Sequence, residues 1–193
     1  MNKIVVPEIE TERLLLREIT PEDLDEFARV IFADTDVLRY MAKRDLTPVE
    51  RAERARKVSV ENWSKHGYGA WLITDKNSSN VIGSCDFDTE EVNGGVELGY
   101  SIGKAYWGKG IATETARAAI RFGFDTAKME RIVGVVVPEN TASWRVLERL
   151  GFVYEKSTQA YGWDELRFYI LQRERFQPDN SFYRVRTSES PWL

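Results

Sequence analysis

Hydrophobic and polar side chains alternate from Val96 to Ile102, which is the period of two expected of a β-strand with unlike faces. From Gly110 onwards the period changes to that of a helix, and small or apolar residues stand at Ala112, Ala116, Ala119, Ile120 and Gly123. The segment Trp107-Gly108-Lys109-Gly110 joins the two patterns. The stretch is therefore predicted to be a strand, a glycine turn and the first turns of a helix.

Glycines in that turn allow the backbone to approach a ligand, and the N–H groups that start the helix suit an anion such as phosphate. A dinucleotide fingerprint would need a third glycine where Thr113 stands and an acid about 20 residues later, whereas the nearest acid closing the next strand is Glu139. A Walker A loop is excluded because no Gly-Lys-Ser/Thr follows a four-residue spacer. On the glycines alone, a turn that binds nothing remains an equal alternative.

Similar patterns elsewhere predict three more helices and six more strands. The helices are expected after Thr20-Pro21, after Thr47-Pro48 and from Asn140 to Leu150, because each begins at a capping residue. The further strands are expected at 14–19, 68–74, 81–87, 131–137, 152–154 and 165–171. Turns are expected at Asn93-Gly94-Gly95 and around Gly162. The fold class is accordingly α/β (α+β), with a mixed sheet of about seven strands and flanking helices.

The amino-acid composition reduces the number of function classes that fit the chain. A chain of 193 residues with 42% hydrophobic and 30% charged residues fits one globular domain, and the net charge of −4 argues against a general nucleic-acid binder and favours cationic substrates. The single cysteine, Cys85, allows no internal disulfide and suggests a reducing compartment. Neither a signal peptide nor a stretch of transmembrane length is apparent, so we expect a cytoplasmic protein with no membrane partner.

Three motifs together resemble the GNAT superfamily of acetyl-CoA dependent N-acetyltransferases. Trp107-Gly108-Lys109-Gly110-Ile111-Ala112 is similar to its pyrophosphate loop, Gln/Arg-x-x-Gly-x-Gly/Ala. Asn140-Thr141-Ala142-Ser143 opens a helix that ends at Leu150-Gly151-Phe152, as in that superfamily, and Thr11 to Arg17 resembles the opening strand of its ribosomal-protein N-terminal (Rim-type) branch. The likeness covers roughly residues 8–176. We therefore expect an acetyltransferase domain over 1–176 and a tail over 177–193 that either docks through its aromatic residues or stays mobile.

The resemblance implies a mostly antiparallel sheet whose fourth and fifth strands splay apart around acetyl-CoA. The backbone of Tyr100, Ser101 and Ile102 would pair with the pantetheine arm, and Asn140 would contact its amide, although asparagine is also a good N-cap. The pyrophosphate would lie on the loop and helix start made by Trp107, Gly108, Lys109, Gly110, Ile111, Ala112 and Thr113. Trp107 replaces the usual Gln or Arg, so one side-chain contact is lost or changed.

Few side chains are available for catalysis. The only histidine, His66, follows a charged helix and more plausibly ends it, and Cys85 has no evident activator, so direct attack of the amine on the thioester is expected rather than an acetyl-enzyme. The resemblance makes Glu97 the base, against the alternative of an exposed or ion-paired glutamate. It also makes Ser143 the group that returns a proton to sulfur, because Leu147 occupies the position of the tyrosine used by many members; Ser143 could equally serve only to start its helix.

Aromatic residues after the first helix and in the last turn, Tyr40, Tyr161 and Trp163, are candidates for the acceptor pocket, together with Met41 and Asp164, although packing is the commoner role of such residues. No metal is expected. The resulting hypothesis is acetyl transfer from acetyl-CoA to a primary amine, foremost a protein N-terminal α-amino group. Acetylation of a small amine such as a polyamine or aminoglycoside, and a non-catalytic acyl-CoA binding module, remain alternatives. A homodimer is compatible with each of them.

Overall fold

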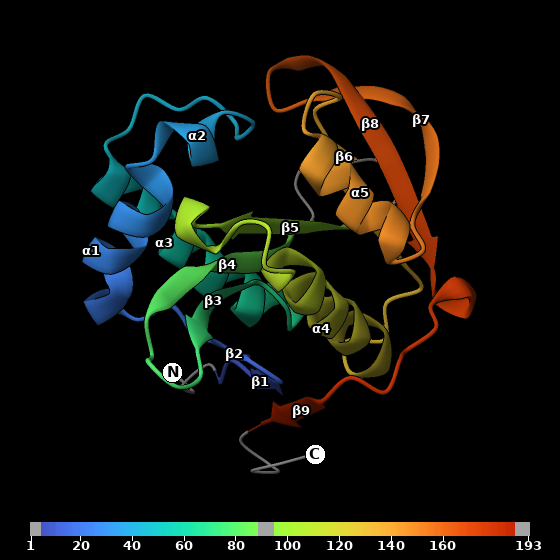
Figure 1. Ribbon diagram of the computed structural model, residues 1–193, viewed down its shortest axis with the longest axis horizontal. Helices are drawn as coiled ribbons and strands as arrows, with labels where there is room; N and C mark the ends of the chain where they lie inside the picture. Colours follow the sequence, from blue (N-terminus) through green and yellow to red (C-terminus); the bar gives the residue numbers. More distant parts are fainter. Residues whose placement is uncertain (1–4, 89–94, 188–193) are drawn as a thin grey trace.

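The computed structural model describes residues 5–88 and 95–187, and within these residues one sheet of nine strands spans the molecule (Figure 1). Its strand order is β7-β8-β6-β5-β4-β3-β2-β1-β9. The strands are β1 (Glu8–Thr11), β2 (Leu14–Arg17), β3 (Ala70–Asp75), β4 (Val81–Asp88), β5 (Val96–Ile102), β6 (Arg131–Val136), β7 (Val153–Ala160), β8 (Trp163–Gln172) and β9 (Tyr183–Arg186). All neighbouring pairs are antiparallel except β5 and β6, so the sheet is mixed and mostly antiparallel.

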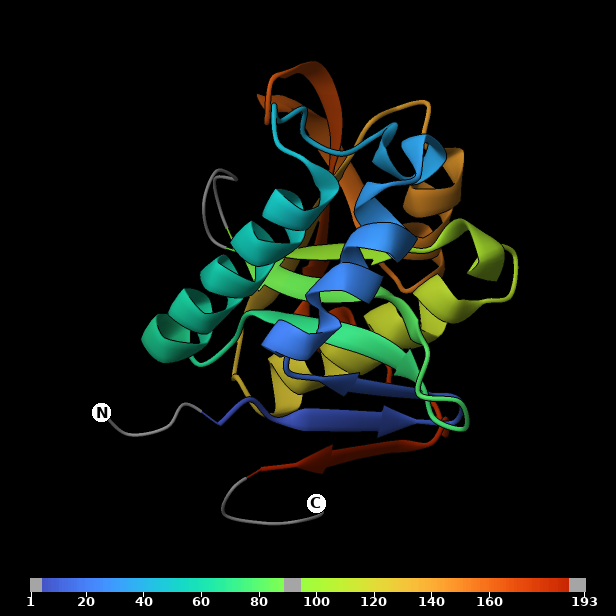
Figure 2. The ribbon, with the colours of Figure 1, turned by 90° about the vertical axis from the view of Figure 1, so that its left-hand side faces the viewer.

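Helices cover both faces of the sheet. One face carries α1 (Leu24–Phe27), which continues into a π-helical turn (Ala28–Phe32), together with α2 (Thr35–Leu38) and α3 (Pro48–His66). The other carries α4 (Ile111–Asp125) and α5 (Thr141–Arg149), and Figure 2 shows α1 and α3 in front of the sheet with α4 behind it. No helix in the described part of the chain is both long enough and apolar enough to cross a membrane.

Local sequence signals explain where the longest helix begins and ends. Thr47 and Glu50 form a capping box in which the Glu50 carboxylate accepts the Thr47 N–H at 2.7 Å and the Thr47 hydroxyl accepts the Glu50 N–H at 3.3 Å. Pro48 fills the first helical position, where no N–H is needed. Gly67 ends the helix in the left-handed conformation, at φ +72°.

Two hydrophobic clusters hold the layers together. The larger contains edge-to-face aromatic contacts such as Trp71 with Phe122, whose centroids are 5.1 Å apart, and joins the sheet to α4 and α5. The smaller packs Phe27, Ile31 and Ala52 of the other helical layer against Leu72. Because helices pack on both faces of the sheet, the register of the central strands is fixed. The positions of the residues at the ends of these strands are therefore fixed as well.

The predicted sheet of about seven strands is wrong in number, because the structure adds β1 and β9. Thr11 to Arg17 is not one strand, since Glu12 and Arg13 form a turn between β1 and β2. The segment after residue 176 contributes β9, which pairs with β1 along Glu8–Thr11. Before β9 the chain turns at Asp179, whose carboxylate accepts the Ser181 N–H at 3.0 Å. Asn93, Gly94, Trp192 and Leu193, for which a turn and docking were expected, lie outside the described residues.

Candidate functional site

The parallel strands β5 and β6 separate soon after they meet. They pair only at Val96 with Ile132 and at Glu97 with Val133. Beyond Glu97, β5 keeps its pairing with β4 on one side, while β6 pairs with β8. The edge of β5 from Leu98 to Ile102 that faces β6 therefore has no strand partner, and the expected splay between these two strands is confirmed.

The glycine loop lies at the end of β5, just before α4. Gly108 and Gly110 both have positive φ, at +74° and +75°, and a Cβ atom at Gly108 would meet nothing within 4 Å. Gly110 is the N-cap of α4 and provides no side-chain cap, and the backbone N–H groups of residues 108–113 donate to no acceptor within the described chain. The loop is exposed from Trp107 to Gly110. Free donors at the positive end of a helix form an anion site.

A second segment fixes this loop from outside. The Arg13 guanidinium, in the β1–β2 turn, donates to the Lys109 carbonyl at 2.9 Å and to the Glu114 carboxylate at 2.7 Å. Glu114 in turn accepts the Arg13 N–H at 3.0 Å and the Thr11 hydroxyl at 2.6 Å. Because the Lys109 carbonyl is engaged by Arg13, the loop N–H groups are held with their open side outward. Sequence reasoning missed Arg13 and Glu114, although Arg13 belongs to one of the motifs that carry the family resemblance.

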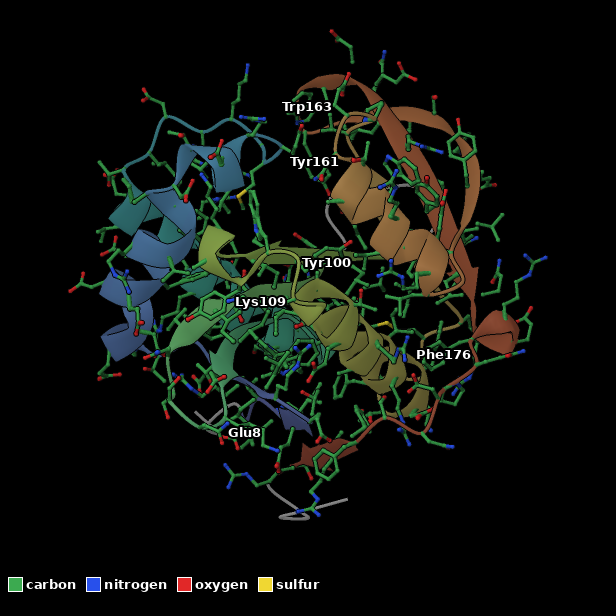
Figure 3. The ribbon with its side chains drawn as sticks, viewed as in Figure 1. Glu8, Tyr100, Lys109, Tyr161, Trp163 and Phe176 are labelled. Carbon is green, nitrogen blue, oxygen red and sulfur yellow. The ribbon has the colours of Figure 1, made fainter. Side chains whose placement is uncertain are left out.

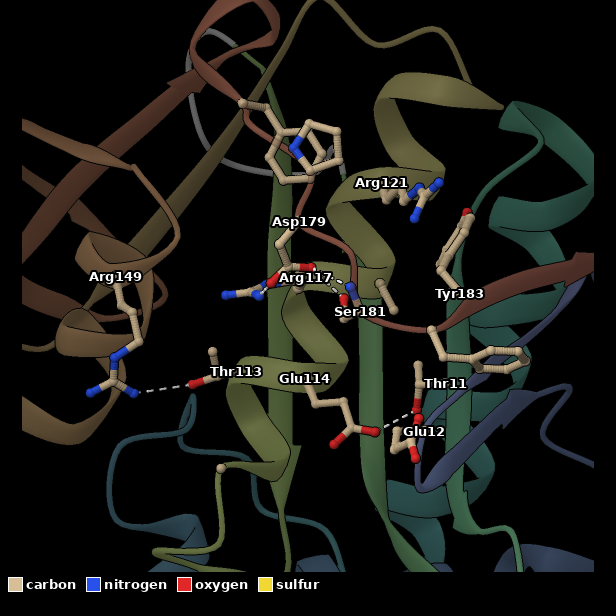
Figure 4. A pocket seen from close by; sticks show the side chains of 15 residues that line it. Thr11, Glu12, Thr113, Glu114, Arg117, Arg121, Arg149, Asp179, Ser181 and Tyr183 are labelled. Carbon is tan, nitrogen blue, oxygen red and sulfur yellow. Dashed lines mark hydrogen bonds and ion pairs between the residues drawn. The ribbon is translucent and has the colours of Figure 1, made fainter.

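A pocket of about 350 Å³ runs along the outer side of α4, next to the loop (Figure 4). The C-terminal segment closes it, and an ion pair between Arg117 on α4 and Asp179 fixes that segment in place. Arg149 of α5 donates to the Thr113 hydroxyl at 3.4 Å across the same pocket. The lining thus places two arginines close to the first turns of α4, in a position suited to negatively charged groups.

Tyr100 connects the two splayed halves of the sheet. Its hydroxyl, which is on β5, lies 3.0 Å from both the carbonyl and the hydroxyl oxygen of Ser143 in the first turn of α5. Burial raises the pKa of Tyr100 well above its ordinary value, so it remains a neutral donor at physiological pH. Asn140 is the N-cap of α5, and its side-chain oxygen accepts the Ser143 N–H at 3.3 Å. Ser143 therefore takes part in the capping of α5 through its N–H and also presents a hydroxyl beside Tyr100.

Glu97 has a partner from the far hairpin. The Tyr161 hydroxyl donates to the Glu97 carboxylate at 2.6 Å, although 64 positions separate the two residues. Tyr161 and Gly162 both have positive φ, at +56° and +78°, and make the two-residue turn between β7 and β8 that directs this side chain inward. Figure 3 shows Tyr161 on the side of this hairpin nearer the centre of the molecule, with Trp163 further out. The structure thus joins Tyr161 to the predicted base.

The other predicted acceptor residues are less directly connected to Glu97. Tyr40 is half-buried in the turn after α2, and Met41 packs against the smaller hydrophobic cluster, so Met41 serves the core. Trp163, the first residue of β8, is half-buried, and Asp164 is exposed. Tyr161 is the residue of this set whose hydrogen bond to Glu97 is described above. Among them, only the role of Tyr161 gains support from geometry.

Trp107, at the position where the family has Gln or Arg, folds back onto β5. Its indole N–H donates to the Ile102 carbonyl at 2.7 Å while 48% of the residue stays exposed. The side chain thus braces the end of the strand, and the backbone donors of the loop are left to meet an anion. Ile102 and Ile111 are buried in the core, so they can contribute to a site only through their backbones, whereas Ser101, Ala112 and Thr113 are half-buried at its margin.

The histidine and the cysteine stand apart from this arrangement. His66 is the last residue of α3 and stacks on Tyr68 at 5.5 Å. Cys85 is fully buried, and burial raises the pKa of its thiol well above the ordinary value, so the nucleophilic thiolate is disfavoured. Among residues 5–88 and 95–187 no group of histidine, cysteine and acidic side chains is arranged to hold a metal ion.

A second carboxyl group, missed by sequence reasoning, faces the same side of the sheet as Glu97. Asp86 on β4 lies directly opposite Gly99 on β5, and Asp88 lies opposite Glu97. Residues opposite one another on antiparallel strands point to the same face, so these three carboxyl groups share it. The signal was available in the alternation of β4, where Ser84, Asp86 and Asp88 occupy one face of a strand next to the central one.

Comparison with known proteins agrees with this geometry. The protein-family model of the acetyltransferase (GNAT) domain matches residues 13–153 of the sequence. The uncharacterized N-acetyltransferase p20 of Bacillus licheniformis is 34% identical over 174 residues, which cover 85% of this chain and 96% of that protein. The ribosomal protein uS5-alanine N-acetyltransferase of Escherichia coli (strain K12) is 33% identical over 112 residues, covering 56% of this chain and 57% of its own.

A solved structure extends the likeness to three dimensions. RimJ of Mycobacterium smegmatis, in complex with CoA-disulfide, has a TM-score of 0.68 with this chain at 21% identity, and the match covers 88% of this chain and 87% of that one. At this level of identity the match shows a shared fold.

Proposed function

Because this chain belongs to the GNAT family of acetyltransferases, we propose that it transfers the acetyl group of acetyl-CoA to the α-amino group at a protein N-terminus. The chain is an acetyl-transferring enzyme of a family that uses acetyl-CoA. The choice of acceptor rests on its likeness to ribosomal-protein acetyltransferases, to which the Escherichia coli relative belongs by name. The absence of a suitable membrane-spanning helix in the described chain is compatible with a reaction in the cytoplasm.

One observation carries the proposal. The uncapped start of α4, with its unengaged N–H groups at residues 108–113, lies at the end of the strand that separates from β6. A diphosphate on these donors would direct the rest of the donor substrate along the unpaired edge of β5, where the backbone of residues 100–102 offers hydrogen bonds. Arg117 and Arg149 lie in the adjoining pocket, where the other phosphate of CoA would gain charge-assisted hydrogen bonds.

Glu97 is the base in this proposal. It stands at the last β5–β6 pair, where the strands begin to separate, so its carboxylate lies at the start of the opening between them. As the nitrogen attacks the thioester carbonyl carbon, Glu97 accepts a proton, the C–N bond forms and the C–S bond breaks. An α-amino group titrates near pH 8 and lysine about two units higher, which makes the N-terminal amine the easier nucleophile.

Ser143 returns a proton to the sulfur. Its hydroxyl is hydrogen-bonded to Tyr100, which burial keeps protonated, so the pair can deliver a proton without building up charge. Asn140 fixes the turn that carries Ser143 by capping α5. No covalent acetyl-enzyme is needed, because the amine attacks the thioester directly.

A thermal-shift measurement with acetyl-CoA tests the donor site. A ligand that binds only the folded state stabilises it by RT ln(1 + [L]/Kd), about 2.7 kcal/mol at a hundred times Kd. We therefore expect millimolar acetyl-CoA to raise Tm by several degrees, and the variant Gly110→Val, which is strained at φ +75°, to lose this response. No shift in the wild-type protein would contradict the proposal.

The acceptor is tested by mass spectrometry with two panels, one of peptides with free N-termini and one of polyamines and aminoglycosides. We expect acetylation at the peptide α-amino group. Transfer confined to the small amines would replace the proposed acceptor while leaving the chemistry intact. Binding of acetyl-CoA with no product in either panel would indicate a non-catalytic module.

A further inference from the structure

Asp86 lies on β4, next to the strand that carries Glu97. It is paired with Gly99, two residues beyond Glu97, and its side chain shares the face of the sheet on which Glu97 receives the Tyr161 hydroxyl. Diagonal neighbours of this kind have Cβ atoms about 7 Å apart, within reach of one small group placed between them. An amine near Glu97 is therefore also near Asp86.

Gly99 leaves the Asp86 carboxyl group uncovered. A Cβ atom at Gly99 would lie 2.8 Å from one carboxyl oxygen of Asp86 and 2.9 Å from the other, closer than real contacts allow. Within residues 5–88 and 95–187, no hydrogen bond or ion pair engages this carboxyl group. A half-buried carboxyl group without a structural partner, facing a glycine in the central strand, is unusual for a purely structural acid.

Burial raises the pKa of Asp86 to about 7, and repulsion from Asp88 adds to the rise. The titratable groups on the same face of the sheet are Asp88 on its own strand and Glu97 on β5, which is bound by the Tyr161 hydroxyl, whereas the adjacent Cys85 points to the opposite face. Ala70, its partner on β3, carries no charge. An acid that titrates close to the value of an α-amino group can exchange a proton with it with little loss of free energy.

We propose that Asp86 is a second catalytic acid–base group, which takes the proton of the incoming ammonium before Glu97 assists the attack. This inference rests on the proposed acetyl transfer to an amine. The ammonium brings three protons: one remains on the amide, one balances the proton that the sulfur receives, and one is released. Asp86 accepts the released proton and passes it to solvent, so the net products are the acetylated amine, CoA and one proton.

The titration of Asp86 can be measured without any substrate. In protein labelled with ¹³C at the aspartate carboxyl groups, we expect one resonance, absent from Asp86→Asn, with a midpoint near pH 7. Asp88→Asn should move this midpoint to lower pH, because it removes the repulsion that raises it. A midpoint near 4 in the wild-type protein would overturn the proposal.

The pH dependence of stability provides a second test, because the raised pKa of Asp86 predicts the direction of the change. The pKa of Asp86 in the folded state lies above its unfolded value of 3.8, so the folded state binds more protons and the free energy of unfolding falls as pH rises from about 4 to about 7. Asp86→Asn removes that fall, and its Tm should therefore exceed that of the wild type at pH 8 but not at pH 4. This outcome also shows that the variant is folded. If Tm depends on pH equally in the wild type and in Asp86→Asn, the carboxyl group of Asp86 is not a buried acid without a partner, and the proposal is contradicted.

The kinetic experiment follows kcat/KM from pH 6 to 9.5 with whichever amine the wild-type enzyme acetylates. We expect Asp86→Asn to lower it about 10- to 100-fold at pH 7, to approach wild type above pH 9, where the amine is already neutral, and to be partly restored by Asp86→Glu. Gly99→Ala, whose Cβ displaces the carboxyl group, should act in the same direction. Glu155→Gln is the control, because it removes an exposed carboxyl group on β7, and it should leave the pH profile of kcat/KM unchanged.

The outcomes separate this proposal from the proposed function. A wild-type enzyme that acetylates no amine in either panel refutes the acetyl-transfer function and this role with it. An active wild type whose pH profile is shared by Asp86→Asn refutes only the role of Asp86. A loss of rate in Asp86→Asn that is equal at every pH would make Asp86 a packing residue rather than a proton acceptor.

Discussion

At the scale of single residues, the two side chains proposed for catalysis are held by contacts between segments that are distant in sequence. Glu97 is held by Tyr161, and Ser143 is held by Tyr100, 43 positions away. Each pair joins one half of the splayed sheet to the other. The groups proposed to react are therefore positioned by side chains that bridge the opening between the two halves.

Replacing Glu97 by Gln should lower kcat about 100-fold at every pH from 6 to 9.5, because the lost base acts while the C–N bond forms. This response differs from that of Asp86→Asn, whose defect should disappear once the amine is neutral. Steady-state rates over a range of peptide concentrations give kcat and kcat/KM for both variants.

Tyr161→Phe is the control for the Glu97 measurement, since it removes the hydrogen bond at 2.6 Å and keeps the ring. We expect a loss of severalfold only, because the carboxylate remains in place. Should Glu97→Gln keep wild-type rates throughout, the glutamate has no part in proton transfer.

The family resemblance makes Glu97, from its position in the strand, and Ser143, from its motif, candidates for catalysis, and both roles stay predictions. It did not identify Asp86, whose importance comes from being opposite Gly99, a relation set by the register of two strands. It also could not pair Tyr161 with Glu97, because the pairing depends on how the β7–β8 hairpin folds over the sheet. Contacts between remote segments leave no local pattern in the chain.

At the scale of elements, the loop before α4 works as a unit with the turn between β1 and β2. Arg13 reaches both the Lys109 carbonyl and Glu114, so the loop is fixed by a side chain about one hundred positions earlier. Arg13 keeps 45% of its side chain exposed, and a single exposed ion pair contributes little to stability. Its main effect is expected on the geometry of the anion site.

Replacing Arg13 by Gln should raise the Kd for CoA about tenfold while changing Tm little, because the loop loses the donor that orients it. Arg13→Lys should be intermediate, since lysine keeps the charge but lacks the planar fork that contacts two acceptors at once. Isothermal titration calorimetry with CoA measures both.

Arg29→Gln serves as the control for Arg13, because the Arg29 side chain is 72% exposed and its ion pair with Glu26 joins the π-helical turn to α1, away from the loop. It should leave the Kd unchanged. An unaltered Kd in Arg13→Gln would show that the loop holds its shape without help from the turn.

Most elements could be predicted from the sequence because their signals are local. The capping box at Thr47 and Glu50 and the alternation in β5 both predicted the observed structure. The strands β1 and β9 were missed because each is short and forms its sheet pairing with a segment at the other end of the chain. Their pairing also spans more than 170 positions, as between Glu8 and Arg186.

At the scale of the whole molecule, the two ends of the described chain meet at one edge of the sheet. β9 lies outside β1, and Val185 is buried against the core. Tyr183 adds a cation–π contact with Arg121 of α4 at 4.4 Å. The C-terminal segment therefore belongs to the packed structure through β9, beyond the region that carries the family likeness.

Ending the chain at residue 176 should remove β9 and expose the apolar surface that Val185 covers. The lost burial should lower the free energy of unfolding by about 2 to 4 kcal/mol. For a chain of this size we expect Tm to fall by about 5 to 15 °C. Differential scanning calorimetry measures the change.

A chain ending at Thr187 keeps all of β9 and should retain the wild-type Tm. The comparison separates the contribution of β9 from that of the residues after it. Equal Tm values for the chains ending at 176 and at 187 would mean that β9 adds nothing to stability.

The position of β9 also determines when the sheet can be completed during synthesis of the chain. Ribosomes synthesise the chain from its N-terminus, so β1 emerges first but must wait for its outer neighbour until residue 186 has left the exit tunnel. During that interval the nascent protein has an unprotected strand edge next to the turn that carries Arg13. The outer pairing of β1 should consequently form only after β9 has emerged from the ribosome.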